Sequence, residues 1–328
     1  NKTIKGVINM NIKKIGLTAL AASLVSVSAH AGSMSVAGGA SIGLKNTSKT
    51  ATGKSWTMGN QLTFTGSGEL DNGMNVSLSF VIDQGDDATT TNNTRDPFDS
   101  HSVTVSSDML GTLVFSGEGG SSAQSAIDTT AAGDLWNNGS GFTSPRASEA
   151  GDNSILYTLP SIMDDLTVKA GYSPASAGGP SATSWSLGYT GVEGLTVNYA
   201  QGNTETIGSE QEHTTMKASY AYGSFTVSLS STESNYNTDS DGLDEQIDSW
   251  QVAYTVSDDI SVSYGQETIE TEDATVDEEA EGLNVSYTTG GVTLSATSYE
   301  FSGAGNSNTE TSATGDKERW ALSATFAF

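Results

Sequence analysis

Apolar and polar residues alternate through most of the chain from about residue 36 to the end. Between residues 74 and 83, every second side chain is apolar and most of the others are Ser, Asn or Asp. Neighbouring side chains of a strand point to opposite faces, so this period predicts a strand with one apolar and one polar face. The pattern recurs along the chain and predicts sixteen strands, whose apolar rows begin at Val36, Met58, Met74, Val103, Leu113, Ile155, Leu166, Trp185, Leu195, Met216, Phe225, Trp250, Ile260, Leu283, Val292 and Trp320.

The connections between these predicted strands alternate in length. Seven are short and rich in the Gly, Asn and Asp that tight turns prefer, as at 71–73 and 191–194. Eight are long and polar, at roughly 45–55, 84–100, 118–152, 174–182, 202–213, 233–247, 267–281 and 301–315. The longest of them, residues 118–152, has no alternation, and a long irregular insert in a regular β-protein is usually functional or disordered.

The apolar faces fit two architectures, because a soluble β-sandwich would turn them inward and a transmembrane barrel would turn them to lipid. Only 35% of the residues are hydrophobic, which is little for the core of a soluble domain of this size. Tyr or Trp recurs at the ends of the apolar rows, as the interfacial girdles of a membrane barrel require. We therefore expect an all-β fold, a sixteen-stranded antiparallel up-and-down transmembrane β-barrel.

The first 31 residues have the composition of a targeting segment. Lys13-Lys14 precedes an apolar run from Ile15 to about Val27, and Ala29-His30-Ala31 supplies small residues at a cleavage position. This order predicts a secretory signal peptide over residues 10–31. The apolar run is too short for a transmembrane helix, which needs about 20 residues. Residues 1–9 precede the first methionine and are expected to be upstream translation, so the barrel domain is expected to span 32–328.

Charge and residue types exclude several classes of function. Cleavage near Ala31 would leave nine basic and 39 acidic residues, a net charge of −30. Such a charge argues against nucleic acid as a partner and fits cations. The chain has no cysteine, and His101 and His213 lack spaced metal ligands or a Gly-x-Ser-x-Gly motif. We therefore expect neither an enzyme nor a cofactor.

Two segments resemble a known family. The ending from Arg319 to Phe328, with alternate apolar residues and a C-terminal Phe, resembles the assembly signal of Gram-negative outer-membrane barrels. Residues 153–172, which read Asn-Ser-Ile-Leu-Tyr-Thr-Leu-Pro and then Leu-Thr-Val-Lys-Ala-Gly-Tyr, resemble the segment after the constriction loop of general bacterial porins. The resemblance implies an outer-membrane homotrimer, in contact with lipid and lipopolysaccharide and assembled through Phe328. It also implies that the third long loop, 118–152, folds into the lumen.

Strand parity places charged side chains in that lumen. With the apolar rows outward, five basic residues point inward, namely Lys45, Lys169, Lys217, Lys317 and Arg319. The third long loop carries Glu118, Asp128, Asp134, Glu149 and Asp152, together with a single Arg146 that could belong to either side. If the loop crosses the pore, its carboxylates could face the basic wall and sort solutes by charge and orientation. Alternatively, the lysines only balance nearby charges or lie at the rim.

The function expected from these features is passive diffusion of small hydrophilic solutes and ions, with a preference for cations because acidic residues are in excess. The alternative is a surface adhesin or structural barrel whose acidic outer loops bind Ca²⁺ or partners. Candidate Ca²⁺ ligands are Asp239, Asp241, Asp244 and Glu245, although they do not form a complete EF-hand pattern. Solvated acidic loops are the simpler interpretation of these residues.

Overall fold

The computed structural model describes residues 32–48, 53–83, 98–139, 141–149, 152–175, 180–206, 209–237, 244–307 and 315–328. In these ranges the chain forms sixteen strands and one short 3-10 helix, η1 (Leu135–Asn138). The strands are β1 (Ser33–Thr47), β2 (Lys54–Glu69), β3 (Asn75–Asp83), β4 (Phe98–Ser107), β5 (Gly111–Glu118), β6 (Ser154–Thr158), β7 (Leu166–Ser173), β8 (Ser181–Val192), β9 (Leu195–Thr206), β10 (Ser209–Tyr222), β11 (Phe225–Tyr236), β12 (Glu245–Ser257), β13 (Ile260–Thr271), β14 (Glu278–Thr289), β15 (Val292–Ala304) and β16 (Gly315–Ala327). The predicted signal peptide lies outside the described residues.

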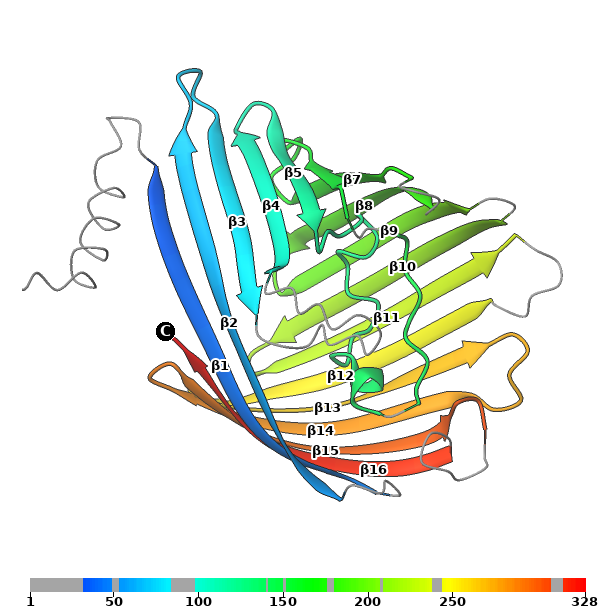
Figure 1. Ribbon diagram of the computed structural model, residues 1–328. Coiled ribbons are helices and arrows are strands. Elements are labelled where there is room, and N and C mark those ends of the chain that lie inside the picture. Colours follow the sequence, from blue (N-terminus) through cyan, green and yellow to red (C-terminus); the bar gives the residue numbers. More distant parts are fainter. Residues whose placement is uncertain are drawn as a thin grey trace, which may run out of the picture.

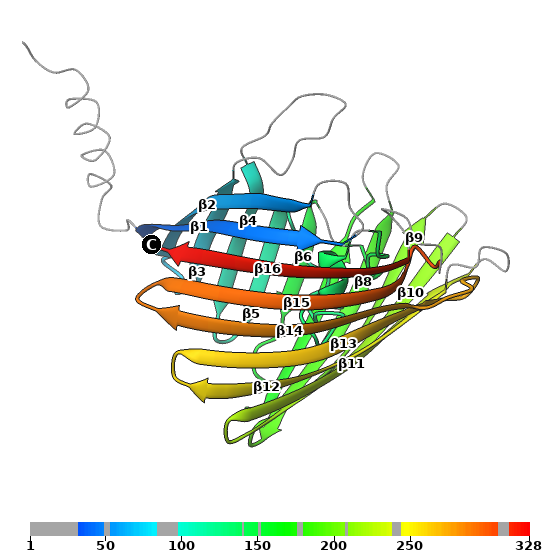
Figure 2. The ribbon, with the colours of Figure 1, turned by 90° about the horizontal axis from the view of Figure 1, so that it is seen from below.

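Each strand pairs antiparallel with its neighbours in sequence, and β1 pairs with β16 to close the barrel (Figures 1 and 2). The closure reaches the last residue, because Gly38 and Phe328 exchange two backbone hydrogen bonds. A Cβ atom at Gly38 would overlap the ring of Phe328. The predicted sixteen-stranded up-and-down barrel is therefore confirmed, and its C-terminal residue is part of the seam.

The alternation of side chains explains why these segments form a closed sheet with two different faces. The apolar rows are exposed on the outer face, where Trp56 and Met58 of β2 are 75% and 77% accessible. Neighbouring strands align these rows, as in the pairs Leu62–Ile82 and Leu78–Val103. Residues of the opposite parity are mostly Ser, Thr, Gly and charged residues. Among the described residues, no helix is long and apolar enough to cross a membrane.

Several strands are longer than the apolar rows predict. The expected long connection 202–213 is instead the end of β9 and the start of β10, and 267–281 belongs largely to β13 and β14. In these extensions neither face is strongly apolar, so the sequence pattern resembles a loop although the backbone continues its ladder. All seven predicted short turns do lie between consecutive strands; at one of them, Gly111 adopts a φ of 78° that favours glycine.

Candidate functional site

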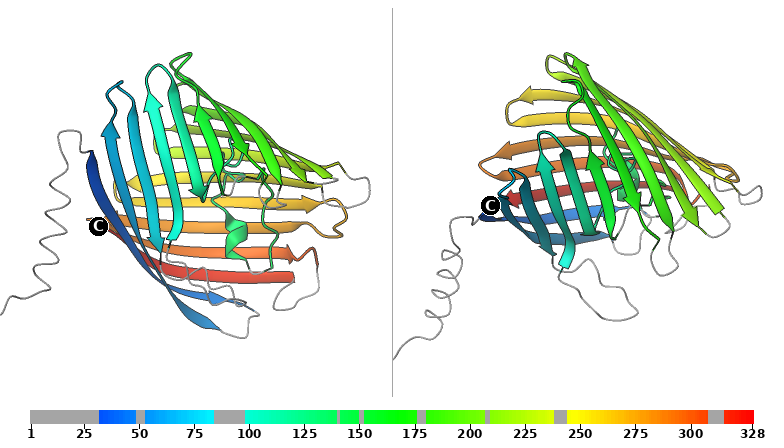
Figure 3. Two further views of the ribbon diagram at one scale, coloured as in Figure 1. Left: turned by 45° about the horizontal axis from the view of Figure 1, so that its top comes forward. Right: turned by 90° about the horizontal axis from the view of Figure 1, so that it is seen from above.

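The segment between β5 and β6 comprises residues 119–153, and its described residues, 119–139, 141–149 and 152–153, lie within the ring of strands, against one side of the barrel wall (Figures 1 and 3). It begins with residues that pack on β8 and β10. The backbone N–H of Ala123 donates to Ser184 Oγ at 2.8 Å, and Gln124 Nε2 donates to Thr215 Oγ1 at 2.8 Å. Gln124 Oε1 accepts the N–H of Ser148 at 2.8 Å, which joins the two ends of the segment. The segment is thus held to the wall and to itself.

Hydroxyl groups of β11 and β12 hold the middle of the segment. The carbonyl oxygen of Thr129 accepts hydrogen bonds from Ser230 and Thr232, each at 3.1 Å. The N–H of Ala131 donates to Ser249 Oγ. Thr232 is fully buried and Ser249 nearly so. Buried backbone groups must find hydrogen-bond partners. These inward-facing hydroxyls provide the partners that the irregular segment lacks within itself.

Three wall glutamates on consecutive strands bind the second half of the segment through its backbone. Glu267 Oε2 accepts the N–H of Trp136 at 2.9 Å, Glu278 Oε2 accepts that of Thr143 at 2.7 Å, and Glu245 Oε1 accepts that of Arg146 at 2.9 Å. The three glutamates are 1%, 0% and 3% accessible, respectively. Buried backbone N–H groups need acceptors, so these three hydrogen bonds fix the segment to the wall.

A small apolar cluster secures the tip around η1. Leu135 and Ala132 of the segment pack with Ala280 of β14 and Phe301 of β15, and all four are buried. Phe142 meets Phe301 edge to face, with ring centroids 5.1 Å apart. These apolar contacts resemble those of a protein core, although they lie on the inner face of the barrel, which is otherwise polar.

The structure brings some predicted basic residues to the segment. Lys217 Nζ donates to Asp128 Oδ2 at 2.8 Å and to the carbonyl of Thr130 at 2.6 Å. Arg319 Nη1 donates to the carbonyl of Asn138 at 2.6 Å. Lys317 is 2% accessible and pairs in register with Phe301. These wall residues therefore contact the segment or lie buried at its edge.

Arg146 belongs to the segment rather than to the wall. Its Nε lies 3.7 Å from Glu245 Oε2, and its guanidinium carbon lies 4.8 Å from the ring centroid of Tyr236. The charges are therefore reversed at this point, with the cation on the segment and the carboxylate on β12. By contrast, Lys45 and Lys169 are partly accessible on β1 and β7, where they were predicted to face the lumen.

The five predicted acidic residues do not form one group. Asp128 is 46% accessible beside Lys217, and Asp134 accepts hydrogen bonds from Thr130 Oγ1 and Trp136 Nε1. Glu149 and Asp152 are exposed near the end of the segment. Glu118 is the last residue of β5, and its Oε2 lies 3.9 Å from Nδ1 of His101. It is thus part of the wall and not of the segment, because the ladder of β4 and β5 continues to this residue.

The candidate Ca²⁺ ligands are divided by the structure. Asp239 and Asp241 lie outside the described residues, Asp244 accepts the N–H of Tyr236 at 2.7 Å, and Glu245 is turned inward to Arg146. Within the described ranges no group of three or more His, Cys, Asp or Glu residues is arranged to hold a metal ion.

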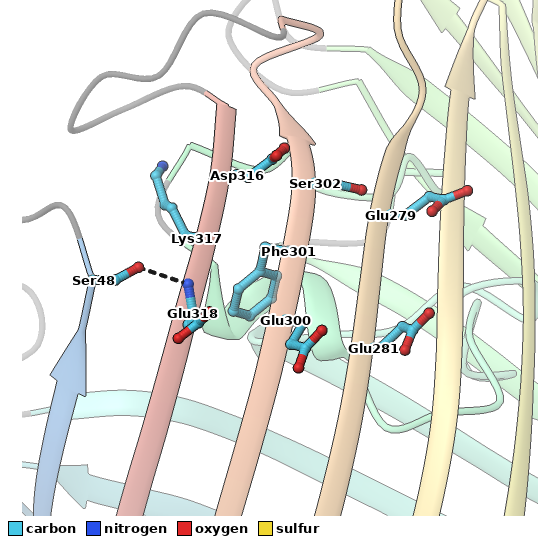
Figure 4. A pocket seen from close by; sticks show the side chains of 9 residues that line it. All are labelled: Ser48, Glu279, Glu281, Glu300, Phe301, Ser302, Asp316, Lys317 and Glu318. Carbon is cyan, nitrogen blue, oxygen red and sulfur yellow. Dashed lines mark hydrogen bonds between the residues drawn. The ribbon is translucent and has the colours of Figure 1, made fainter.

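A row of carboxylates crosses the outer face of β14, β15 and β16. Glu281 is opposite Glu300, and Glu300 is opposite Glu318, so like charges face one another across neighbouring strands. Figure 4 shows Glu281, Glu300 and Glu318 on three neighbouring strands. Tyr264 donates to Glu281 at 2.5 Å, and the N–H of Glu318 donates to Ser48 Oγ at 2.8 Å. This row is separate from the three inward glutamates.

Glu267 and Glu278 were not among the residues predicted to form the pore constriction, and Glu245 was predicted as a candidate Ca²⁺ ligand. One signal could have found them. Ile247 and Ile269 have the inward parity, and both are almost completely buried. Apolar residues on a predicted polar face indicate that something packs against that face, and the glutamates two residues before each isoleucine lie under the same cover.

Comparisons with known proteins agree with the class that this fold defines, a closed barrel of the outer-membrane channel type. The family model of Gram-negative porins matches residues 16–288, so the chain belongs to that family and is a channel-forming protein of the Gram-negative outer membrane. No curated protein matches the sequence.

Solved structures share the fold at low sequence identity. A loop-deletion mutant of OmpT, an outer membrane protein of Vibrio cholerae, is 16% identical with a TM-score of 0.67, over 91% of this chain and 100% of that one. An anion-selective porin from Comamonas acidovorans is 15% identical with a TM-score of 0.64, over 90% and 99%. A mutant porin of Rh. blastica is 14% identical with a TM-score of 0.65, over 90% and 100%.

Proposed function

We propose that this protein is a passive diffusion channel for small hydrophilic solutes and ions, and that residues 119–153 form its constriction. The observation that carries the proposal is the attachment of the segment to the inner faces of the strands from β8 onward. A piece of chain fixed inside a barrel reduces the open cross-section and puts its own side chains in the path of solutes. The predicted boundary at Glu118 moves by one residue, because Glu118 belongs to β5.

We further propose that the channel prefers cations. Four of the basic residues expected at the neck are engaged or covered: Lys217 binds Asp128 and Thr130, Arg319 binds Asn138, Arg146 lies beside Glu245, and Lys317 is buried. Glu149 and Asp152 are exposed, and Asp128 is 46% accessible. Because the basic side chains contact the segment while these carboxylates are open to water, the electric field in the pore favours positive ions.

In this proposal, fewer carboxylates of the segment face basic residues of the wall across open water than the sequence predicted. Lys217 and Asp128 touch directly, so no water-filled gap separates them, and the pair of Arg146 and Glu245 has the opposite polarity. Lys45 and Lys169 remain the wall cations to set against the exposed carboxylates. The fold alone does not set the sign of selectivity, since the structurally similar Comamonas porin is described as anion-selective.

The test is the reversal potential of the purified protein in a planar bilayer under a KCl gradient. We expect a permeability ratio that favours K⁺ over Cl⁻. Substituting Lys169 and Lys217 together with alanine is expected to increase that ratio. A preference for Cl⁻ in the wild-type protein, or a ratio that does not change in the double variant, would contradict the assignment of these residues to the neck.

The assembly state and partners are also part of this proposal. Membership of the family supports a homotrimer, contact with lipopolysaccharide, and recognition of Phe328 by the barrel-assembly machinery as proposals for this chain. The broad exposed apolar surface around Trp56 and Met58 supports burial of the outer face by lipid or by another copy of the chain. Light scattering of the detergent-solubilised protein would distinguish a trimer from a monomer.

A further inference from the structure

Four glycines on the inner face of the barrel lie directly beneath the segment 119–153. A Cβ atom at Gly171 of β7 would stand 2.9 Å from the backbone nitrogen of Ala123. At Gly202 of β9 it would overlap Cβ and Oγ of Ser148, at Gly265 of β13 it would stand 2.9 Å from Ala132 Cβ, and at Gly282 of β14 it would stand 2.6 Å from Leu135 Cδ2. We call these four residues the glycine track.

The backbone conformation does not require glycine at any position of the track, although at Gly265 a Cβ atom would also stand 2.6 Å from the carbonyl oxygen of Trp250 on the neighbouring strand. None of the four has the positive φ that favours glycine. The ladders are regular there: Gly202 pairs with Ser184 and His213, and the register shifts of this region lie elsewhere. Glycine in a strand commonly marks either a bulge or a close approach of other atoms. Because the ladder is regular at these positions, a close approach is the remaining explanation.

The track follows the segment along its length. Gly171 and Gly202 lie under its two ends, which Gln124 and Ser148 join, while Gly265 and Gly282 lie under the tip around η1. Each glycine therefore lets a different part of the segment approach the wall more closely than any other residue would allow. The hydroxyl and carboxylate groups that bind the segment project from neighbouring inward positions.

We propose that the glycine track sets the width of the channel by fixing how closely the constriction lies against the wall. This inference rests on the proposed function of the segment. The four glycines are positioning residues, because they act through the segment and need not touch a solute. Atoms in contact need about 3.5–4.0 Å between carbons, so one methyl group at Gly202 would push Ser148 toward the lumen by roughly 1 Å or more.

The test is single-channel conductance, together with the largest polyethylene glycol that enters the pore. Gly202→Ala is expected to lower the conductance roughly 1.5- to 2-fold and to exclude smaller polymers. Ser148→Gly removes the two nearest atoms that a Cβ at Gly202 would meet and leaves Gln124 Cβ at 3.3 Å, so the double variant should recover most of the wild-type conductance. Gly39→Ala is the matched control on the inner face of β1, because its Cβ would have no foreign atom nearer than 3.8 Å.

Gly282→Ala provides an independent variant, in case Gly202→Ala does not assemble. Barrel assembly is checked by the electrophoretic mobility of unheated samples. Equal conductance of the two glycine variants and Gly39→Ala in assembled barrels, or no recovery when Gly202→Ala is combined with Ser148→Gly, would overturn the inference. If Asp128→Asn changes ion selectivity while the glycine variants leave conductance unchanged, the inference fails and the proposed constriction stands. If neither set has an effect, the constriction itself is refuted.

Discussion

Removal of the Glu278 carboxylate should release part of the constriction. Glu278 is fully buried, and its two oxygens accept backbone N–H groups from two different places. Oε2 binds Thr143 of the segment at 2.7 Å, and Oε1 binds Gly305 at 2.8 Å and Asn306 at 3.4 Å. One side chain thus ties the constriction to the connection that follows β15.

The magnitude follows from the groups left without an acceptor. In Glu278→Ala the two short hydrogen bonds disappear, and each buried N–H that loses its partner costs about 1–3 kcal/mol. The expected loss is therefore about 2–6 kcal/mol. Part of it is local, because the segment can detach while the barrel ladder persists. Gln in place of Glu keeps one acceptor oxygen but adds an amide donor, so its effect should be intermediate.

The assay is urea unfolding of the detergent-solubilised protein, followed by tryptophan fluorescence, together with limited proteolysis of the native barrel. Glu279→Ala is the matched control, because Glu279 directly follows Glu278 in the chain and its own carboxylate is exposed on the outer face. We expect Glu278→Ala to unfold at lower urea and to be cleaved faster within 119–153. A Glu278→Ala variant that matches Glu279→Ala in both measurements would show that the buried carboxylate does not hold the segment.

Three further outcomes are expected. Lys217→Met frees the Asp128 carboxylate from its 2.8 Å ion pair, so the K⁺/Cl⁻ permeability ratio from reversal potentials should rise about twofold; an unchanged ratio would place the pair away from the ion path. Leu135→Ala empties the centre of the apolar cluster and should weaken docking of the segment by about 2–4 kcal/mol, seen as faster proteolysis there and not elsewhere. Gly38→Leu should displace the Phe328 ring and lower the yield of barrel that resists unfolding in unheated detergent samples; Gly66→Leu, with no foreign atom within 4 Å, should not.

Period-two alternation was sufficient to predict the barrel. Each apolar row is a local property of a strand facing lipid, and the alternation of short and long connections then fixes the up-and-down order. The same rule predicts that Lys217 and Arg319 face inward, and in the structure both donate hydrogen bonds to the segment. Strand ends were predicted poorly, because beyond the lipid layer neither face needs to be apolar.

The contacts of the constriction could not be read from the sequence in this way. They join residues far apart in the chain, such as Trp136 with Glu267, and depend on which parts of an irregular segment meet which strands. Glu245 illustrates the difficulty, since its acidic neighbours indicated a solvated loop whereas the inward parity of its strand buries it beside Arg146. The inward parity of the apolar residue Ile247 would have indicated that the segment packs against the inner face at this position.

The attachment of the constriction to the strands from β8 onward also divides the barrel into two parts with different tolerance to change. Side chains of β8 to β16 hold the segment by hydrogen bonds, and the glycine track begins on β7, so a substitution on these inner faces alters the support of the constriction. The inner face of β1 to β3 is mainly Ser, Thr and Gly and includes Lys45. That face offers positions where a charge or an aromatic ring can be introduced to change solute preference while the support of the constriction stays intact, and this makes β1 to β3 the best place to redesign the pore.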